Sequence, residues 1–334
     1  MAPPPLDPTQ SLLRWGIENA APGSMIPLHE DIKSGRRPDL NTDVLKAIMG
    51  TSDADRMNEC VKVIQGKWVD RDGTGLGDKD VTIEDKLRAW DDLEMLIEDL
   101  DNANDLKFNG LWKPIFGFVT DENDEVALRA CWVCGTAVQN NPRAQQAFLE
   151  LDPLPTLLPL LTSSTISAAV RNKAMYCLSS TLKHSPEAVA RFTELNGWDV
   201  LNKALQDPSQ TLRTKTAFLL SQLISQSPTS LLPILRSSHI LYSLLNSLSP
   251  TTALPTGPNG DVEAVDADYR DKGLRVIVNA VMGEQEGSEG LTAEERKLLA
   301  GVLAELEGTD GWSAEEDLGM STGEWKDFLG RVAK

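Results

Sequence analysis

The sequence predicts an all-α fold of stacked helices, and three observations lead to that prediction. Hydrophobic residues make up 41% of the 334 residues, which is too much for a disordered acidic chain and enough for a core. Aromatic residues make up only 5%, which fits a helical core rich in Leu and Ala better than a β-sandwich. The third observation is a repeated segment in the central part of the chain, which marks a row of similar helical units.

The N-terminal part is predicted to hold short helices between loops. Residues 1–10 are rich in proline, and SLLRWGIEN (11–19) has the pattern of a short amphipathic helix. Asn41 is a suitable N-cap for a second helix. The further elements expected here are a Gly/Pro connector at 20–38, helices at 41–49 and 53–65, and a Gly/Asp loop at 70–80.

From residue 82 onward the sequence repeats itself. Three segments each carry a basic residue near their start and a proline thirteen positions after it: LRACWVCGTAVQNNP (128–142), NKAMYCLSSTLKHSP (172–186) and TKTAFLLSQLISQSP (214–228). A fainter copy lies at 87–101, and 271–282 reads as a fifth, partial copy. A period of roughly 40–47 residues with two or three helices is typical of armadillo and HEAT repeats. We therefore predict an armadillo-like, right-handed α-solenoid of about four repeats with helical caps.

Each copy is followed by a second apolar helix, expected at 110–119, 152–161, 197–205 and 238–248. The prolines lie just past helix ends, where they stop a helix without removing a needed hydrogen bond. Amphipathic patterns at 291–306 and 317–332 predict two C-terminal helices. The predicted organisation is a flexible N-terminal segment (1–38), a helical cap with a loop (39–82), the repeats (83–282) and an acidic C-terminal helical segment (283–334).

The net charge of −18 disfavours binding to nucleic acid and to anionic membranes. This charge is unevenly distributed. Residues 126–243 hold ten basic and six acidic residues, whereas 70–105 hold four and thirteen, and 284–317 hold two and eleven. The basic repeats could steer an acidic partner. Alternatively, the acidic ends only solvate the caps of the stack.

The compartment is expected to be the cytoplasm. No signal peptide precedes the helices, no run approaches the ~18 apolar residues of a membrane span, and four cysteines are too few for a disulfide scaffold. We expect that the protein needs no cofactor or metal, because the three histidines lie in no ligand spacing and the motifs of nucleotide-binding loops and hydrolases are absent. It is expected to be a monomer.

Two near-matches to chemical motifs have structural alternatives. The loop that begins at Asp70 resembles a calcium loop, but Val81 stands where the bidentate glutamate is needed, which favours a solvated linker. Cys131 and Cys134 form a C-x-x-C motif, which is either a redox pair or part of the core of a repeat helix. The helical pattern favours the core, and we do not expect an enzyme.

Arg129, Lys173 and Lys215 recur at one phase of the repeat and would form a ladder across the stack. The ladder could contact a partner, or its members could bond to carbonyls of neighbouring repeats. A further possibility is a general armadillo scaffold for an extended peptide. Such grooves use arrays of Trp and Asn on the last helix of each repeat, to which we assign Trp112 and Trp198 without any phased Asn.

Three segments resemble a known family: SLLRWGIEN, EDKLRAWDDLEMLIEDLDNAND (84–105) and LRACWVCGTAVQNNP. In that order they closely resemble the cytosolic armadillo-type nucleotide-exchange factors of the 70-kDa heat-shock chaperone, especially the fungal members. The resemblance covers roughly residues 11–280. It implies a non-enzymatic mechanism in which the concave repeat surface embraces one lobe of the chaperone's nucleotide-binding domain. Opening of the ADP site then lets ATP bind, and the chaperone releases its client.

The resemblance also implies roles for particular residues. Asn102, Ala103 and Asn104 are expected at a turn that faces the groove, and the ladder of Arg129, Lys173 and Lys215 is expected to contact the chaperone. Charge reversal at Lys215 or a bulky side chain at Ala103 should then abolish binding. In fungal members the N-terminal segment is associated with client release, and the apolar patch for that role would be Leu12, Leu13, Trp15 and Ile17.

Overall fold

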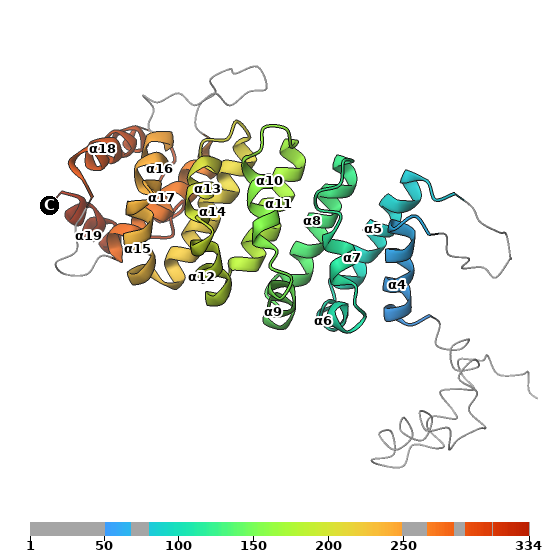
Figure 1. Ribbon diagram of the computed structural model, residues 1–334. Helices are drawn as coiled ribbons and strands as arrows, with labels where there is room; N and C mark the ends of the chain where they lie inside the picture. The colour runs from blue at the N-terminus through green and yellow to red at the C-terminus, as the bar shows by residue number, and fades with distance from the viewer. Residues whose placement is uncertain (1–50, 68–79, 249–265, 284–290, 309, 334) are drawn as a thin grey trace, which may run out of the picture. The chain divides into compact units, whose positions relative to one another are not determined.

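A computed structural model describes residues 51–67, 80–248, 266–283, 291–308 and 310–333. The chain separates into two compact units, residues 1–59 and 60–334. In the described residues every regular element is a helix, as predicted (Figure 1). The helix expected at 53–65 is confirmed as α4 (Asp53–Ile64). The helices expected at 11–19 and 41–49 and most of the loop expected at 70–80 lie outside the described residues.

The second unit is built from layers of three helices, which confirms the predicted solenoid of about four repeats. The third helix of each layer is long, and these helices pack side by side in chain order, beginning with one that precedes the first complete layer (Figure 1). The long helices are α5 (Ile83–Ile97), α8 (Asp124–Val138), α11 (Ala168–Leu182), α14 (Gln210–Gln226) and α17 (Ala267–Met282).

Each layer begins with two short helices, which repeat in the same order along the unit. The first helices are α6 (Leu100–Phe108), α9 (Pro142–Leu149), α12 (Pro186–Glu194) and α15 (Pro228–Ser237). The second helices are α7 (Trp112–Phe116), α10 (Leu154–Thr162), α13 (Gly197–Ala204) and α16 (Ile240–Leu248), all within the predicted ranges or a residue beyond them.

The repeated prolines begin helices. Pro142, Pro186 and Pro228 occupy the first turn of α9, α12 and α15, where the missing amide hydrogen is not needed. The backbone reverses just before two of these starts through residues in the left-handed region, with φ of 53° at Asn140 and 58° at His184. These prolines were predicted only to end helices, so the short first helices that follow them were not predicted from the sequence.

Each long helix starts at a residue whose side chain accepts a hydrogen bond from a backbone amide of the first turn. These N-caps fix the rotational start of every long helix, so residues at equal distances from them take equivalent positions. The five N-cap residues are Thr82, Asn123, Ser167, Ser209 and Asp266.

The partial fifth copy proves to be a complete long helix, α17, whose apolar side includes Leu274 and Ile277, both fully buried. Beyond it, the two predicted C-terminal helices are confirmed as α18 (Ala293–Glu307), which packs on α16, and α19 (Thr322–Val332), which packs on α17. The segment boundaries at residues 38, 82 and 282 stay predictions. Across the described ranges, we find no helix that combines the length and apolar character of a membrane span.

Candidate partner-binding site

A cation occupies the same position on all five described long helices, six residues after the N-cap. We call this set the basic ladder. Three of its members were predicted from the sequence, and the structure adds one at each end. Its members, in chain order, are Arg88, Arg129, Lys173, Lys215 and Lys272.

The three central members each contact the preceding long helix. The Arg129 Nε donates to Asp91 Oδ1 on α5 at 2.9 Å, and its guanidinium also pairs with Glu125 on its own helix. The Lys173 Nζ lies 3.6 Å from the ring centre of Trp132 on α8. The Lys215 Nζ donates to the Asn172 carbonyl on α11 at 3.1 Å, as the alternative of bonds between repeats predicted. These contacts hold the cations in place and leave each side chain half-buried.

Lys173 and Lys215 differ from Arg129 in their electrostatic surroundings. Among the described residues, neither lysine forms an ion pair with a carboxylate. Burial lowers the pKa of both ammonium groups, and the positive charges of Lys215 and Arg129 lower the pKa of Lys173 further, against an opposing effect of Glu94. A carboxylate from outside the chain would therefore find two neighbouring cations without acidic partners of their own.

An aromatic row accompanies the ladder, one helical turn further along. Trp132, Tyr176 and Phe218 each follow a ladder residue by three positions and lie at the same place on successive long helices. This row was not predicted from the sequence. The signal was present as a basic residue, two intervening residues and an aromatic residue, which occurs in all three central copies.

Tyr176 is positioned by contacts that cross three long helices. A Cβ added at Gly135 of α8 would lie 2.6 Å from the Tyr176 ring, so the glycine makes room for the tyrosine of α11. The Tyr176 hydroxyl donates to Gln139 Oε1 at 3.0 Å and lies 3.4 Å from Thr136, which in turn donates to the buried Glu94 of α5. This network holds the phenol at the edge of the ladder.

The segment around Ala103 differs from its prediction. Asn102, Ala103 and Asn104 lie within helix α6, whose N-cap is Asp99, and not on a turn. Ala103 is 1% exposed, and the Asn102 amide donates to the Leu96 carbonyl at 2.9 Å, so these side chains support the α5–α6 junction. The three residues are therefore on a short first helix and not in the row of long helices that carries the ladder. Their predicted role in binding remains a prediction.

Two further assignments concern residues outside the ladder. Trp112 and Trp198 lie on the second helices α7 and α13 and are buried, so their assignment to the last helix of a repeat was wrong. Their rings pack against Phe148 and Phe192 in the core. The apolar patch of Leu12, Leu13, Trp15 and Ile17 lies outside the described residues.

The cysteines of the C-x-x-C motif lie inside the stack. Cys131 and Cys134 on α8 and Cys177 on α11 each have no exposed surface. Burial raises the pKa of the Cys131 thiol to about 12 and the pKa of the other two thiols well above their usual value. Because the thiolate is the reactive form, this environment favours packing over redox chemistry.

The sequence matches two known protein families. Residues 9–106 match the family described as "Nucleotide exchange factor Fes1". Residues 102–231 match the "SIL1/FES1/HPBP1 C-terminal domain". The two matches together cover the first three complete layers and the start of the fourth, including the central ladder residues.

Similar proteins occur in fungi. A protein of Mycosarcoma maydis named "Hsp70 nucleotide exchange factor FES1" is 40% identical over 332 residues, which cover 80% of this chain and 82% of that protein. A protein of the same name from Cryptococcus neoformans is 32% identical over 299 residues, covering 82% and 74%. Among solved structures, a designed armadillo repeat protein with a (KR)4 peptide is 16% identical, with a TM-score of 0.56 over 84% of this chain and 100% of that one. This last likeness shows the armadillo fold alone.

Proposed function

The chain belongs to the Fes1 family of nucleotide exchange factors, and we propose from this membership that it binds the nucleotide-binding domain of a 70-kDa heat-shock chaperone and accelerates the release of ADP. The chain itself would catalyse no covalent step. Its site of action would be the cytoplasm, where ATP then replaces ADP and the chaperone releases its client.

The observation that carries the proposal at the level of the site is the pair Lys173 and Lys215. Two half-buried ammonium groups lie on adjacent long helices, beside an aromatic row and without acidic partners among the described residues. Such a surface favours an acidic patch on one lobe of the chaperone domain. Each cation is held by a contact to the preceding helix, so binding would cost little side-chain ordering.

The mechanism is a coupling of two binding equilibria. A protein that weakens ADP binding to the chaperone must itself bind the chaperone less tightly when ADP is present. The two affinities change by the same ratio. The exchange factor would therefore bind the nucleotide-free domain best. No chemistry at the ladder is required, because the binding energy of the ladder surface opens the nucleotide site.

The rate of fluorescent-ADP release from the purified chaperone tests this proposal. Stoichiometric amounts of the chain should accelerate release, and excess ADP should dissociate the complex of chain and chaperone because of the reciprocal coupling. A release rate that is the same with and without the chain would refute the proposed function.

The N-terminal segment is proposed to assist client release. Leu12, Leu13, Trp15 and Ile17 would supply an apolar surface for the client-binding side of the chaperone. Deleting residues 1–20 should slow the release of a labelled client peptide and leave ADP release unchanged, because the ladder is intact. Unchanged client release in the truncated chain would contradict this role.

A further inference from the structure

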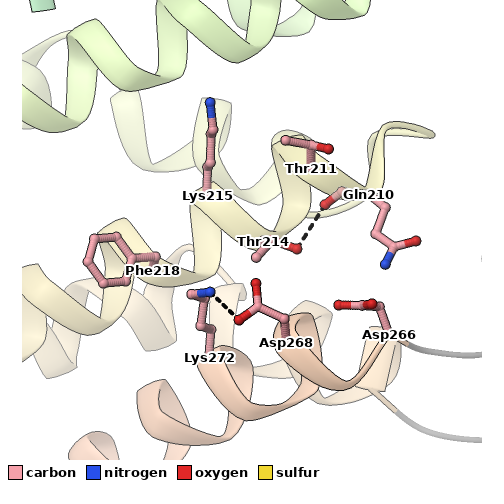
Figure 2. A pocket seen from close by; sticks show the side chains of 8 residues that line it. All are labelled: Gln210, Thr211, Thr214, Lys215, Phe218, Asp266, Asp268 and Lys272. Carbon is pink, nitrogen blue, oxygen red and sulfur yellow. Dashed lines mark hydrogen bonds and ion pairs between the residues drawn. The ribbon is translucent and has the colours of Figure 1, made fainter.

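Lys173, at the centre of the ladder, receives no carboxylate from its own helix. The ladder residue at the far end, Lys272, pairs with Asp268 four residues earlier on α17 (Figure 2). In contrast, α11 contains no Asp or Glu. The Lys173 ammonium lies beside two rings, 3.6 Å from the ring centre of Trp132 and 6.0 Å from that of Tyr176. Its position therefore depends on what holds these rings.

A buried carboxylate anchors one of the two rings. Glu94 on α5 is 8% exposed, and its Oε1 accepts from the Thr136 hydroxyl of α8 at 2.9 Å. The Thr136 hydroxyl also lies 3.4 Å from the hydroxyl of Tyr176 on α11. Because an ionised carboxylate can only accept hydrogen bonds, the Thr136 proton is committed to Glu94, and the Thr136 oxygen faces Tyr176 as an acceptor. Glu94 thus fixes the direction of a hydrogen-bond chain that runs from α5 across α8 to α11.

Packing alone does not explain a carboxylate at this position. Within the described part of the chain Glu94 forms no ion pair, and a buried carboxylate without a cation lowers the stability of a fold. Burial and the neighbouring cation of Lys215 lower the pKa of the Lys173 ammonium, and the Glu94 charge opposes this change. Glu94 therefore weakens the core in which it lies and favours the charged form of a ladder residue.

We propose that Glu94 is a positioning residue of the partner-binding site, which acts through Thr136 and Tyr176 to hold the Lys173 ammonium in the ladder. The inference rests on the proposed function, in which Lys173 meets an acidic group of the chaperone's nucleotide-binding domain. Glu94 is too deeply buried to touch the partner itself. Because the chain of hydrogen bonds holds the Tyr176 ring, the ammonium is in place before the partner arrives, and less side-chain order is lost on binding.

Substitution of Glu94 by methionine tests this role, because methionine has a similar size and offers Thr136 no comparable acceptor. In the NMR spectrum of the free chain, the Trp132 ring should shift the Lys173 ε-methylene resonances upfield, and Glu94→Met should reduce that shift. Affinity for the nucleotide-free chaperone domain, measured by calorimetry, should fall about 2- to 10-fold. The free energy of unfolding should stay equal or rise, because a buried carboxylate is removed. An affinity equal to that of the unchanged chain would overturn the inference.

Two further variants test the chain of hydrogen bonds. Glu94→Gln retains an acceptor oxygen for Thr136 and should keep most of the upfield shift and most of the affinity. Thr136→Val removes the hydroxyl between Glu94 and Tyr176, so it should lose as much affinity as Glu94→Met does. Combining the two substitutions should add little to either loss. Fully additive losses would contradict a chain through Thr136.

Gln145→Met is the matched control, because Gln145 is a buried polar residue that also supports α11. It is 3% exposed, and its amide donates to the Ser180 and Lys183 carbonyls, both at 2.8 Å. Its replacement should lower the free energy of unfolding and leave the affinity of the folded chain unchanged, the reverse of the result expected at Glu94. An unaltered Lys173 resonance in Glu94→Met would refute the positioning role alone, whereas failure of the unchanged chain to bind the chaperone domain would refute the proposed function.

Discussion

Lys215→Glu is expected to abolish acceleration of ADP release by this chain. Its ammonium lies on the central part of the ladder next to Lys173, and neither has an acidic partner among the described residues. Reversal of the charge would place a carboxylate where the proposed partner presents one. Loss of a close charge pair at an interface costs about 2–5 kcal/mol, which corresponds to a loss in affinity of roughly 30-fold or more.

Two comparison variants separate lost binding from lost structure. Lys215→Met keeps the aliphatic stem that is half-buried between α11 and α14 and removes only the charge and the bond to Asn172, so it should show an intermediate loss. Lys203→Glu makes the same charge reversal at an exposed position of α13, away from the ladder, and should exchange nucleotide normally. Unchanged helicity by circular dichroism, together with full activity of Lys215→Glu, would remove the ladder from the mechanism.

The order of the long helices could be predicted because each central copy has the same spacing from its cation to its proline. The distance from one ladder cation to the next is also nearly constant, at 44 residues from Arg129 to Lys173 and 42 from Lys173 to Lys215. Lys272 follows Lys215 by 57 residues, so the period was lost and only part of α17 was recognised. Asp266, the N-cap of α17, lies six residues before Lys272, as the other N-caps lie before their ladder residues. Asp266 could be identified as a cap only from the structure.

The segment DNAND (101–105) shows why part of the site could not be predicted. Asp and Asn favour turns because their side chains bond to the nearby backbone. In α6 the same kind of bond caps a helix, because the Asp99 side chain accepts hydrogen bonds from the amides of Asp101 and Asn102 at the start of α6. Burial of Ala103 and Leu106 then favours the helix over the turn. Local residue preference alone cannot show which of these two outcomes the packing selects.

The aromatic row was missed for a different reason. Trp132, Tyr176 and Phe218 could have been aligned from the sequence, but their importance depends on which side of the helix is covered by the next layer. That information is tertiary, because Lys173 and Trp132 lie on different helices and meet only in the stack.

Arg171→Leu is expected to cause a large loss of stability. The Arg171 Nη2 donates to Asp207 Oδ1 at 3.0 Å, and the side chains are only 11% and 12% exposed. The same guanidinium bonds to the Ile166 carbonyl, and Asp207 also accepts from the Ser209 amide at 2.8 Å. Removal of the arginine leaves a nearly buried carboxylate without its cation, which costs about 3–5 kcal/mol. The free energy of unfolding in urea, compared at constant m-value, measures this cost.

A double-mutant cycle with Asp207→Asn tests the cause of that loss. Asparagine keeps an oxygen for the Ser209 amide and removes the charge, so Arg171→Leu should cost much less in its presence, and the two effects should be non-additive by about 2 kcal/mol. Arg191→Leu is the matched control, because Arg191 forms a pair with Asp152 that spans a similar stretch of sequence but is exposed. Its effect on the urea midpoint should be far smaller, since solvent screens the exposed pair.

Because Asp207 bonds to the N-cap Ser209, the pair also fixes the start of α14 and, six residues later, the position of Lys215. Arg171→Leu chains that remain folded should therefore bind the chaperone domain more weakly than unchanged chains, whereas purely additive stabilities in the cycle would contradict a direct pair.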